Sequence, residues 1–400
     1  MLKLYVVAAC SFLVLSCAAA VPLAAQTYAP GWTQLNDTKL QSVCPSDGFG
    51  GATDPNGTPY QFSKFCQYVI RAWGGGIFDA AGNRSILWGG GHSDYGGNEI
   101  YSVNYGQNPP TVTRLNDPST PLANYGNCSP AAPDGKPNAR HTYNGMAYHA
   151  AARKMFVFNG GVYCGNGSHF NDTWMLDLAT LTWTRMDPTN GTDLTRASDQ
   201  PYASANYDPN TQDIFVAIPV SGTIYLYKYT YGPKGSINSY SPQLSNGPGP
   251  ENATGVIDVA RKKLFLMGSD NTNAGRIVSV DISSNSKYAL NDITAQTSGC
   301  SGLISSAWPG LAYEPISQTI VGWNVNKGNS VYVFDPGTNE CSTYDYSGGP
   351  STGSAPGTFG RWQRIGPGIF AAVAPDWNLD TYVLSIPELA AERYRRFQRK

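Results

Sequence analysis

Short apolar segments recur along the chain, separated by turns rich in Gly, Asn, Asp and Pro. Each repeat contains an apolar run, a turn, a second apolar run that often ends in Gly-Gly, a variable loop, and a run with hydroxyl and aromatic residues. Runs this short, bounded by turn residues, are typical of β-strands. The pattern predicts strand pairs in six copies, which start at Gly76, Gly145, Ala203, Thr254, Gly310 and Gly368.

The copies follow one another at a spacing of roughly fifty to seventy residues, which is the signature of propeller blades. We therefore expect an all-β chain that folds into a β-propeller of six blades. Residues 36–71 carry no copy of the repeat, so a count of seven blades is the alternative.

The two ends of the chain are expected to share one blade. The last copy stops soon after Ser385 without an outer strand, while Trp32–Leu35 (WTQL) resembles the outer strand at Trp183–Met186 (WTRM). Pairing of the terminal strands would close the ring and remove the unpaired strand edges that promote aggregation.

Composition agrees with this fold and excludes several classes of partner. The chain has 44 Gly, 28 Pro and 25 Tyr, and only 14% of its residues are charged, as suits many short strands joined by tight turns. Its net charge is -1, and Lys and Arg form no run before the last residues. Neither nucleic acid nor an anionic membrane is therefore an expected partner.

The first 25 residues are expected to be a signal peptide, because Lys3 precedes an apolar run that is followed by small residues. A lipobox-like Val-Leu-Ser before Cys17 leaves a lipid anchor as the alternative. The propeller domain is then 26–390, followed by a short basic tail at 391–400, and no other stretch could span a membrane. We expect a secreted monomer.

The loops of a four-stranded blade open on two faces. Connections into the innermost strand and between the second and third strands open on one face, here called the front face. His92 and His169 lie in loops between second and third strands, and His141 lies just before an innermost strand, so all three are expected at the front. His149 lies on the back-face turn, where other copies have Asp or Glu, and is expected to be structural.

Six cysteines remain after removal of the signal peptide, an even number that suits disulfides in an oxidising compartment. Their spacings match no zinc motif. Two of them share the front-face loops of one blade, and another two are close in sequence. The expected disulfide cysteines are Cys128 with Cys164, Cys44 with Cys66, and Cys300 and Cys341.

The repeat resembles the kelch and galactose-oxidase type of propeller. Gly160 and Gly161 after a second strand, and Trp183 in a later strand, are the marks of that type. The resemblance covers nearly all of the chain beyond the signal peptide, and it implies a fold rather than an activity. A galactose-oxidase copper site needs a Tyr crosslinked to a Cys. Since Cys164, beside Tyr163, is expected in a disulfide, we expect no metal and no cofactor.

Because the ring closes, the last, first and second blades are neighbours, and their front loops should meet near the axis. The Gly-rich segment around His92 allows sharp bends and close approach of a ligand to the backbone. The alternative is that these loops only pack against each other. The expected catalytic residues are His92, His141, Tyr143 and Arg140, and the expected substrate-binding residues are Arg361, Trp362, Tyr95, Asn98, Asn144, Trp73 and Trp308.

This set of residues suits sugars that carry carboxylates. Arg or protonated His can neutralise a uronate carboxylate, and His or Tyr can then exchange protons during β-elimination. Trp side chains stack on sugar rings. In this respect the chain resembles the propeller-fold polysaccharide lyases, including ulvan lyases and rhamnose-glucuronate lyases, and the resemblance implies an extracellular polysaccharide as partner. A non-catalytic propeller that binds carbohydrate or protein is the alternative, followed by a copper-radical oxidase or a glycosidase.

Overall fold

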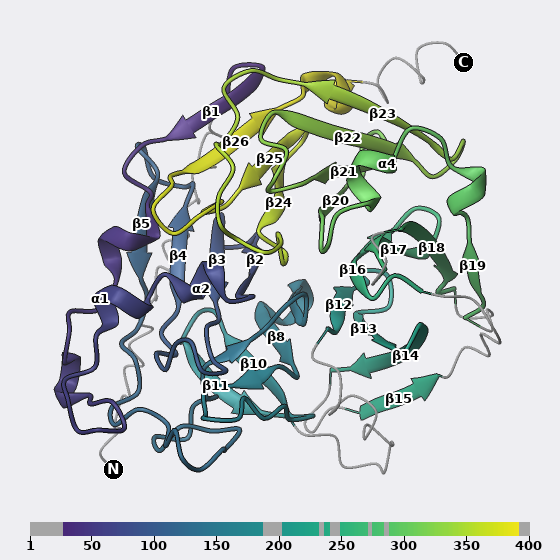
Figure 1. Ribbon diagram of the computed structural model, residues 1–400. Helices are drawn as coiled ribbons and strands as arrows, with labels where there is room; N and C mark the ends of the chain where they lie inside the picture. The colour runs from purple at the N-terminus through teal and green to yellow at the C-terminus, as the bar shows by residue number, and fades with distance from the viewer. Residues whose placement is uncertain are drawn as a thin grey trace, which may run out of the picture.

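The computed structural model describes residues 27–186, 202–231, 236–240, 249–270, 274–283 and 288–391. Six four-stranded antiparallel sheets are arranged in a ring (Figure 1). The expected signal peptide and all but the first residue of the expected basic tail lie outside the described residues.

Blades 1 to 3 follow one another along the chain. Blade 1 contains β2 (Gly75–Asp79), β3 (Arg84–Trp88), β4 (Tyr101–Asn104) and β5 (Thr111–Arg114). Blade 2 contains β7 (Met146–His149), β8 (Lys154–Phe158), β10 (Thr173–Asp177) and β11 (Thr182–Arg185). Blade 3 contains β12 (Ser204–Tyr207), β13 (Asp213–Val220), β14 (Thr223–Thr230) and β15 (Ser236–Tyr240).

Blades 4 to 6 complete the ring, and blade 6 takes its outer strand from the start of the chain. Blade 4 contains β16 (Asn252–Asp258), β17 (Lys263–Ser269), β18 (Gly275–Asp281) and β19 (Leu290–Asp292). Blade 5 contains β20 (Gly310–Glu314), β21 (Thr319–Trp323), β22 (Ser330–Asp335) and β23 (Glu340–Asp345). Blade 6 contains β24 (Trp362–Gly366), β25 (Ile369–Ala372), β26 (Thr381–Ser385) and β1 (Gly31–Leu35).

The ring closes as the sequence predicts. The innermost strands contact one another in the order β24, β2, β7, β12, β16, β20 and back to β24. Strand β1 pairs antiparallel with β26, with Trp32 opposite Leu384 and Leu35 opposite Thr381. The assignment within the last copy is wrong by one strand, because the segment from Gly368 holds the second and third strands. The innermost strand of that blade is β24, whose polar Gln363 and Arg364 hide it from an apolar pattern.

Residues 36–71 do not form a seventh blade. They contain the short helices η1 (Leu40–Val43), η2 (Phe49–Gly51), α1 (Phe62–Phe65) and α2 (Tyr68–Arg71). Phe62 and Ile70 from this segment pack in one core with Tyr101 of blade 1, and Figure 1 shows α1 and α2 beside that blade. The remaining elements are β6 (Arg140–His141), η3 (Ala150–Ala152), β9 (Gly161–Val162), η4 (Thr294–Gln296) and α4 (Ser301–Ile304).

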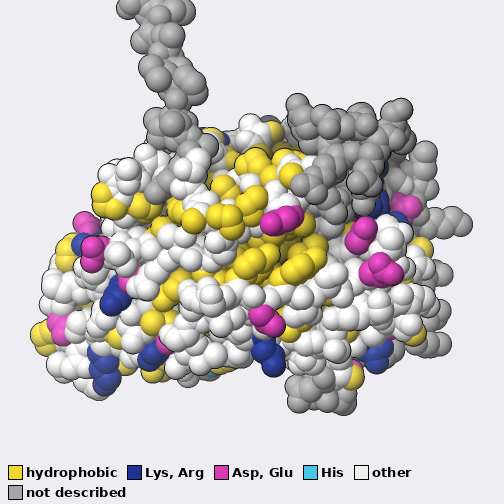
Figure 2. Space-filling view, turned by 90° about the horizontal axis from the view of Figure 1, so that it is seen from above, with side chains coloured by type: hydrophobic (Ala, Val, Ile, Leu, Met, Phe, Trp, Pro, Cys, Tyr) yellow, Lys and Arg dark blue, Asp and Glu magenta, His cyan; other side chains and the backbone are white. Residues whose placement is uncertain are grey.

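The balance of apolar and polar residues in a strand depends on the position of the strand within its blade. Second strands such as β8 and β21 are buried on both faces between neighbouring blades, so they read as continuous apolar runs. Outer strands such as β11 and β23 are mostly exposed and carry Thr, Ser and charged residues. Figure 2 views the rim from above Figure 1 and shows hydrophobic side chains gathered between scattered acidic and basic ones.

A side-chain acceptor at the end of the innermost strand caps the following turn in several blades. Asp79 accepts from Gly82 N at 3.0 Å, and Glu314 accepts from Ile316 N at 3.0 Å. His149 occupies this position in blade 2, where its Nδ1 accepts from Ala152 N at 3.2 Å. The expectation that His149 is structural is confirmed.

The expected disulfides Cys128–Cys164 and Cys44–Cys66 are present, and the other two expected disulfide cysteines, Cys300 and Cys341, are bonded to each other. The Cα atoms are 5.3 Å apart in Cys128–Cys164, 6.1 Å in Cys44–Cys66 and 5.2 Å in Cys300–Cys341, all within the range that a disulfide spans. Within the part of the chain that the structure describes, no helix is long and apolar enough to cross a membrane.

We expect Trp32→Ala to lower the free energy of unfolding by about 3 kcal/mol. The Trp32 ring lies 6.0 Å from Trp362 and 6.2 Å from Trp323, so it joins blade 6 to blade 5. Urea unfolding measures the change. The control is Tyr344→Ala on exposed β23, which should change the value by less than about 0.5 kcal/mol; equal losses in both variants would contradict the closing role of Trp32.

Candidate functional site

Aromatic residues surround the axis at the front face. Five blades place one on the segment that leads into the innermost strand, and four of these residues have positive φ between 45° and 53°. This left-handed conformation turns the chain sharply at the axis. The axial aromatic cluster consists of Trp73, Tyr143, Tyr202, Trp308 and Phe359.

Tyr143 lies at the centre of this cluster. Its ring centroid is 6.0 Å from Trp73 of blade 1, 5.1 Å from Tyr202 of blade 3, 5.9 Å from Trp308 of blade 5 and 5.8 Å from Phe359 of blade 6. Contact with four other blades from one side chain shows that Tyr143 fills the axial mouth. The described residues therefore form an aromatic floor at the front end of the axis.

The expected histidines meet beside this floor. The rings of His92 and His141 are stacked with centroids 5.1 Å apart and planes 15° apart, and His169 lies 6.4 Å from His92. His92, His141 and His169 are here called the histidine cluster. The His141 ring is also 4.8 Å from Trp73, so the histidine cluster adjoins the axial aromatic cluster. The expected convergence of His92 and His141 in one place is what the geometry shows.

His141 forms a dyad with an acidic residue. Its Nε2 is 2.8 Å from Oδ2 of Asp94, while Nδ1 makes no hydrogen bond to any residue that the structure describes. Burial lowers the pKa of His141, and the Asp94 carboxylate opposes that shift. His141 is therefore neutral at neutral pH, with an orienting carboxylate on one nitrogen. The residue is buried, with 3% of its surface exposed.

The loop around His92 holds the ring in place. His92 itself has φ of 48°, and its backbone N donates to Gly161 O at 3.1 Å. A Cβ at Gly167 would overlap the His92 ring, and Gly167 also has φ of 61°, so both the close approach and the backbone conformation favour glycine at this position. His92 and His169 are half-buried, and burial lowers the pKa of His169, with the neighbouring imidazoles adding to the shift.

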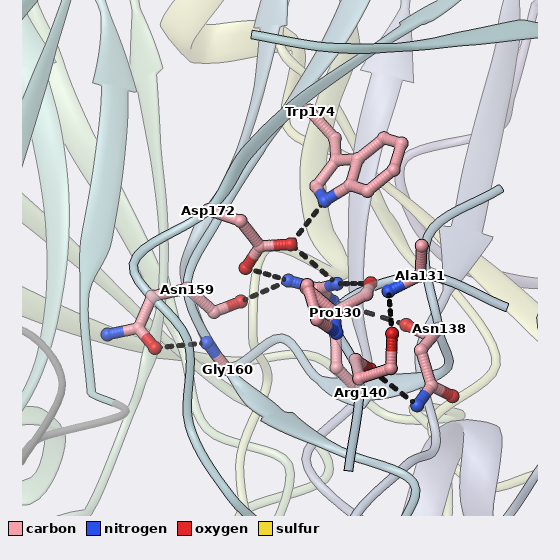
Figure 3. Close-up of polar contacts among 9 residues, drawn as sticks. Pro130, Ala131, Asn138, Arg140, Asn159, Gly160, Asp172 and Trp174 are labelled. Atoms are coloured by element: carbon pink, nitrogen blue, oxygen red, sulfur yellow. Dashed lines mark hydrogen bonds and ion pairs between the residues drawn. The ribbon is translucent and has the colours of Figure 1, made fainter. Parts of the chain in front are cut away.

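Arg140 does not reach the front-face surface. Its side chain is fully buried and forms a bidentate pair with Asp172 at 2.7 and 3.0 Å (Figure 3). Its remaining donors bond to the backbone oxygens of Asn138, Asn159 and Pro130. Since all of its donors are used, the structure gives Arg140 the role of holding the loop before β7, and the expected catalytic role does not fit this placement.

Arg361 is buried as well. Its guanidinium donates to Ala374 O at 2.6 Å and to Gly357 O at 2.7 Å, and burial lowers its pKa to about 10. Trp362 lies within β24 rather than before it, stacked on Phe370 at 5.5 Å. Neither residue is placed to contact a ligand at the mouth. The position expected for Trp362 is occupied by Phe359.

Three further expected binding residues serve the framework. Tyr95 is fully buried and donates to the carboxylate of Glu99. Asn98 donates to Ser119 Oγ at 2.8 Å, and Asn144 donates to Ala253 O at 3.1 Å. Asn144 thereby ties blade 2 to blade 4 beneath the mouth. Trp73 and Trp308 are half-buried at the mouth, as expected of ligand contacts.

Sequence reasoning missed Tyr202 and Phe359 and did not single out Asp94 as the partner of His141. The aromatic position has a signal in the repeat, because Trp73, Tyr143, Tyr202 and Trp308 each stand six residues before the turn-capping residue of their blade. Asp94 carries no such signal, since it belongs to blade 1 and its partner to blade 2.

The described residues contain no group of three or more His, Cys, Asp or Glu side chains arranged to hold a metal ion. The sulfur of Cys164 is bonded to Cys128, so it is not available for a crosslink to Tyr163. The front face presents the His141–Asp94 pair and the axial aromatic cluster.

No protein-family model matches the chain, and no curated protein matches it. Among solved structures, the chain is similar to YjhT, with 10% identity and a TM-score of 0.49 over 79% of this chain and 95% of that one. It is also similar to a fungal alcohol oxidase of the AA5 family in complex with copper, with 13% identity and a TM-score of 0.43 over 70% of this chain and 54% of that one. A third similar structure is TolB from Acinetobacter baumannii, with 14% identity and a TM-score of 0.40 over 69% of this chain and 54% of that one. The chain spans about half the length of the last two proteins. These likenesses concern the fold alone.

We expect Arg140→Ala to lower the free energy of unfolding by about 3 to 5 kcal/mol, because it leaves the buried Asp172 carboxylate unpaired. Thermal or urea unfolding measures the loss. Lys154→Ala, which removes a partly exposed pair with Asp177 in the same blade, is the control and should cost less than about 1 kcal/mol. An Arg140→Ala protein of unchanged stability would return Arg140 to the candidates for ligand contact.

Proposed function

We propose that the protein is a carbohydrate-active enzyme, a polysaccharide lyase that cleaves uronate-containing polymers by β-elimination at the front-face mouth. The observation that carries the proposal is the His141–Asp94 dyad beside half-exposed His92, on an aromatic floor. A neutral, oriented imidazole is suited to removing a proton from carbon, and aromatic rings are suited to stacking on a sugar.

The reaction assigns one role to each group. Neutral His141 removes the proton on the carbon next to the uronate carboxylate, and the electron pair forms a carbon–carbon double bond as the bond to the leaving oxygen breaks. His92 donates a ring N–H to the uronate carboxylate, whose negative charge grows as the proton leaves. His92 has this role because the guanidinium groups of Arg140 and Arg361 are buried and donate hydrogen bonds to other groups of the protein.

Tyr143 supplies the proton for the leaving oxygen. Burial raises the pKa of its hydroxyl, so the group stays protonated at neutral pH. Its ring centroid is 6.0 Å from that of His141, and its hydroxyl makes no hydrogen bond to any residue that the structure describes. The base and the acid therefore adjoin one site, as β-elimination requires.

The aromatic floor supports binding of the sugar rings. Trp73, Tyr202 and Trp308 are half-buried and come from blades 1, 3 and 5. The same floor supports the alternative of a carbohydrate-binding propeller without catalysis. The two functions can be told apart by their outcome. Only elimination creates an unsaturated sugar that absorbs ultraviolet light, whereas binding leaves the polymer unchanged.

We expect His141→Ala and His92→Ala each to lower turnover at least about a hundredfold while the fold stays intact, the usual scale for a positioned acid or base. Turnover is followed by ultraviolet absorbance with a panel of uronate polysaccharides, and folding by thermal unfolding. His149→Ala, on the back face, is the matched control for turnover. Wild-type protein that binds these polymers without forming unsaturated or reducing ends would favour the binding module.

Asp94→Asn should shift the acid side of the activity profile to lower pH. His141 works as a base only when neutral, so activity falls as the pH drops through its pKa. The Asp94 carboxylate raises that pKa, and its removal therefore lowers the pH at which half of the activity is lost. The control is Asp117→Asn, which changes an exposed carboxylate of blade 1. If Asp94→Asn left the pH of half-maximal activity unchanged, Asp94 would not be acting on the catalytic base.

A further inference from the structure

A cavity of about 420 Å³ lies on the axis of the ring, toward the back face. All six innermost strands line it, and these strands surround the centre of the ring in Figure 1. In blades 1 to 5 the lining includes the residue just before the turn-capping residue, which places the cavity at the back end of the strands. The cavity, here called the axial cup, shares no lining residue with the axial aromatic cluster or the histidine cluster.

Most of the surface of the axial cup is apolar. Alkyl side chains such as Met146, Val256 and Leu311 form its wall, and four half-buried aromatic residues lie at its back end. These four residues are Phe78, Tyr148, Tyr207 and Tyr313. The two amide side chains in the wall already donate to backbone oxygens, Asn206 to Ser204 O at 3.2 Å and Gln363 to Gly360 O at 2.9 Å. The cup therefore suits the hydrocarbon part of a small molecule, and its volume lies in the range of small-molecule sites.

Blade 6 places a cation where other blades have an aromatic ring. Arg364 lies opposite Phe370 of the second strand, just as Tyr148 lies opposite Met155 in blade 2. The two residues therefore occupy the same position in their blades. Arg364 is the only charged residue among the described residues that line the cup. A cation at the edge of an apolar cavity attracts an anionic group attached to an apolar body.

Only one nitrogen of the Arg364 guanidinium has a partner in the protein. Its Nε donates to Oε2 of buried Glu314 at 2.8 Å. The Glu314 carboxylate also accepts from Gly368 N at 2.7 Å and from Ile316 N at 3.0 Å, so backbone donors share in satisfying it. The terminal nitrogens Nη1 and Nη2 of Arg364 make no hydrogen bond to any residue that the structure describes. Two adjacent N–H groups of a guanidinium match the two oxygens of a carboxylate.

We propose that the axial cup binds a monocarboxylate with an apolar body, of which a medium-chain fatty acid is the simplest example. The carboxylate lies on the terminal nitrogens of Arg364, and the hydrocarbon chain lies against the alkyl wall. A sugar acid fits less well, because its hydroxyls would lose water without gaining partners on that wall. The inference does not depend on the proposed function, which uses other residues on the opposite face.

Methyl NMR of the mature protein labelled with methyl-¹³C methionine tests the site, because Met146 lines the cup. Its signal is assigned with Met146→Leu, which conserves side-chain volume. Titration with octanoate should shift the Met146 signal in a saturable manner and leave the ring signals of the histidine cluster unchanged. Octanol, which keeps the chain but lacks the charge, should bind at least about tenfold more weakly. Acetate, which lacks the chain, should cause no shift at Met146.

Arg364→Gln should weaken octanoate binding at least about tenfold and leave octanol binding unchanged, because it removes only the charged partner. The matched control is Arg153→Gln, which changes another back-face arginine, 3.5 Å from the Asp79 carboxylate and outside the cup. The control should bind octanoate within about twofold of wild type. Thermal unfolding confirms that both variants are folded. If Arg364→Gln does not fold, the comparison of octanoate with octanol on wild-type protein decides.

Three results would overturn the proposal. The first is an unchanged Met146 signal in the presence of octanoate. The second is equal affinity of the wild-type protein for octanoate and octanol, which would remove the role of Arg364. The third is a shift at the histidine cluster instead of at Met146, which would place the acid on the front face.

Discussion

The arrangement depends on ring closure by the two ends of the chain. Strand β1 pairs along its whole length with β26, and this removes the free edge that blade 6 would otherwise present. Closure also makes blade 6 a neighbour of blade 1, so that Phe359 and Trp73, which are 286 residues apart in the sequence, both contact Tyr143 at the axis. The mouth exists as a single surface only because the ring is complete.

Crowding at the axis then decides which side chains remain available. Six innermost strands converge there, and backbone bonds link the loops, including Tyr143 N to Trp73 O at 2.8 Å and Trp308 N to Asn252 O at 2.8 Å. Long polar side chains near the axis satisfy buried carbonyls, as Arg361 does. Rings fill the remaining space, and the histidine cluster adjoins them where the blade 1 and blade 2 loops meet. The proposed chemistry uses the histidine cluster and the aromatic rings beside it.

The sequence carries the fold in its strand pattern, and the site only in part. The outer strand at Trp183 and the closing strand at Trp32 were predictable because outer strands repeat a motif, whereas β24 was hidden by its polar residues. The meeting of His92 with His141 followed from loop topology. The burial of Arg140 could not be predicted in the same way. Topology shows which loop contains a residue, but it does not show that a partner such as Asp172 will hold the side chain inside the protein.

The most direct test of the central claim is the ring-nitrogen NMR spectrum of protein labelled with ¹⁵N-histidine, recorded during titration with uronate-containing oligosaccharides. Three of the four histidines lie in one cluster at the front mouth, and His149 lies on the back face as an internal reference. The account predicts that the signals of His92 and His141 shift together in a saturable manner while His149 stays unchanged. Saturation without any shift at His92 and His141 would contradict it.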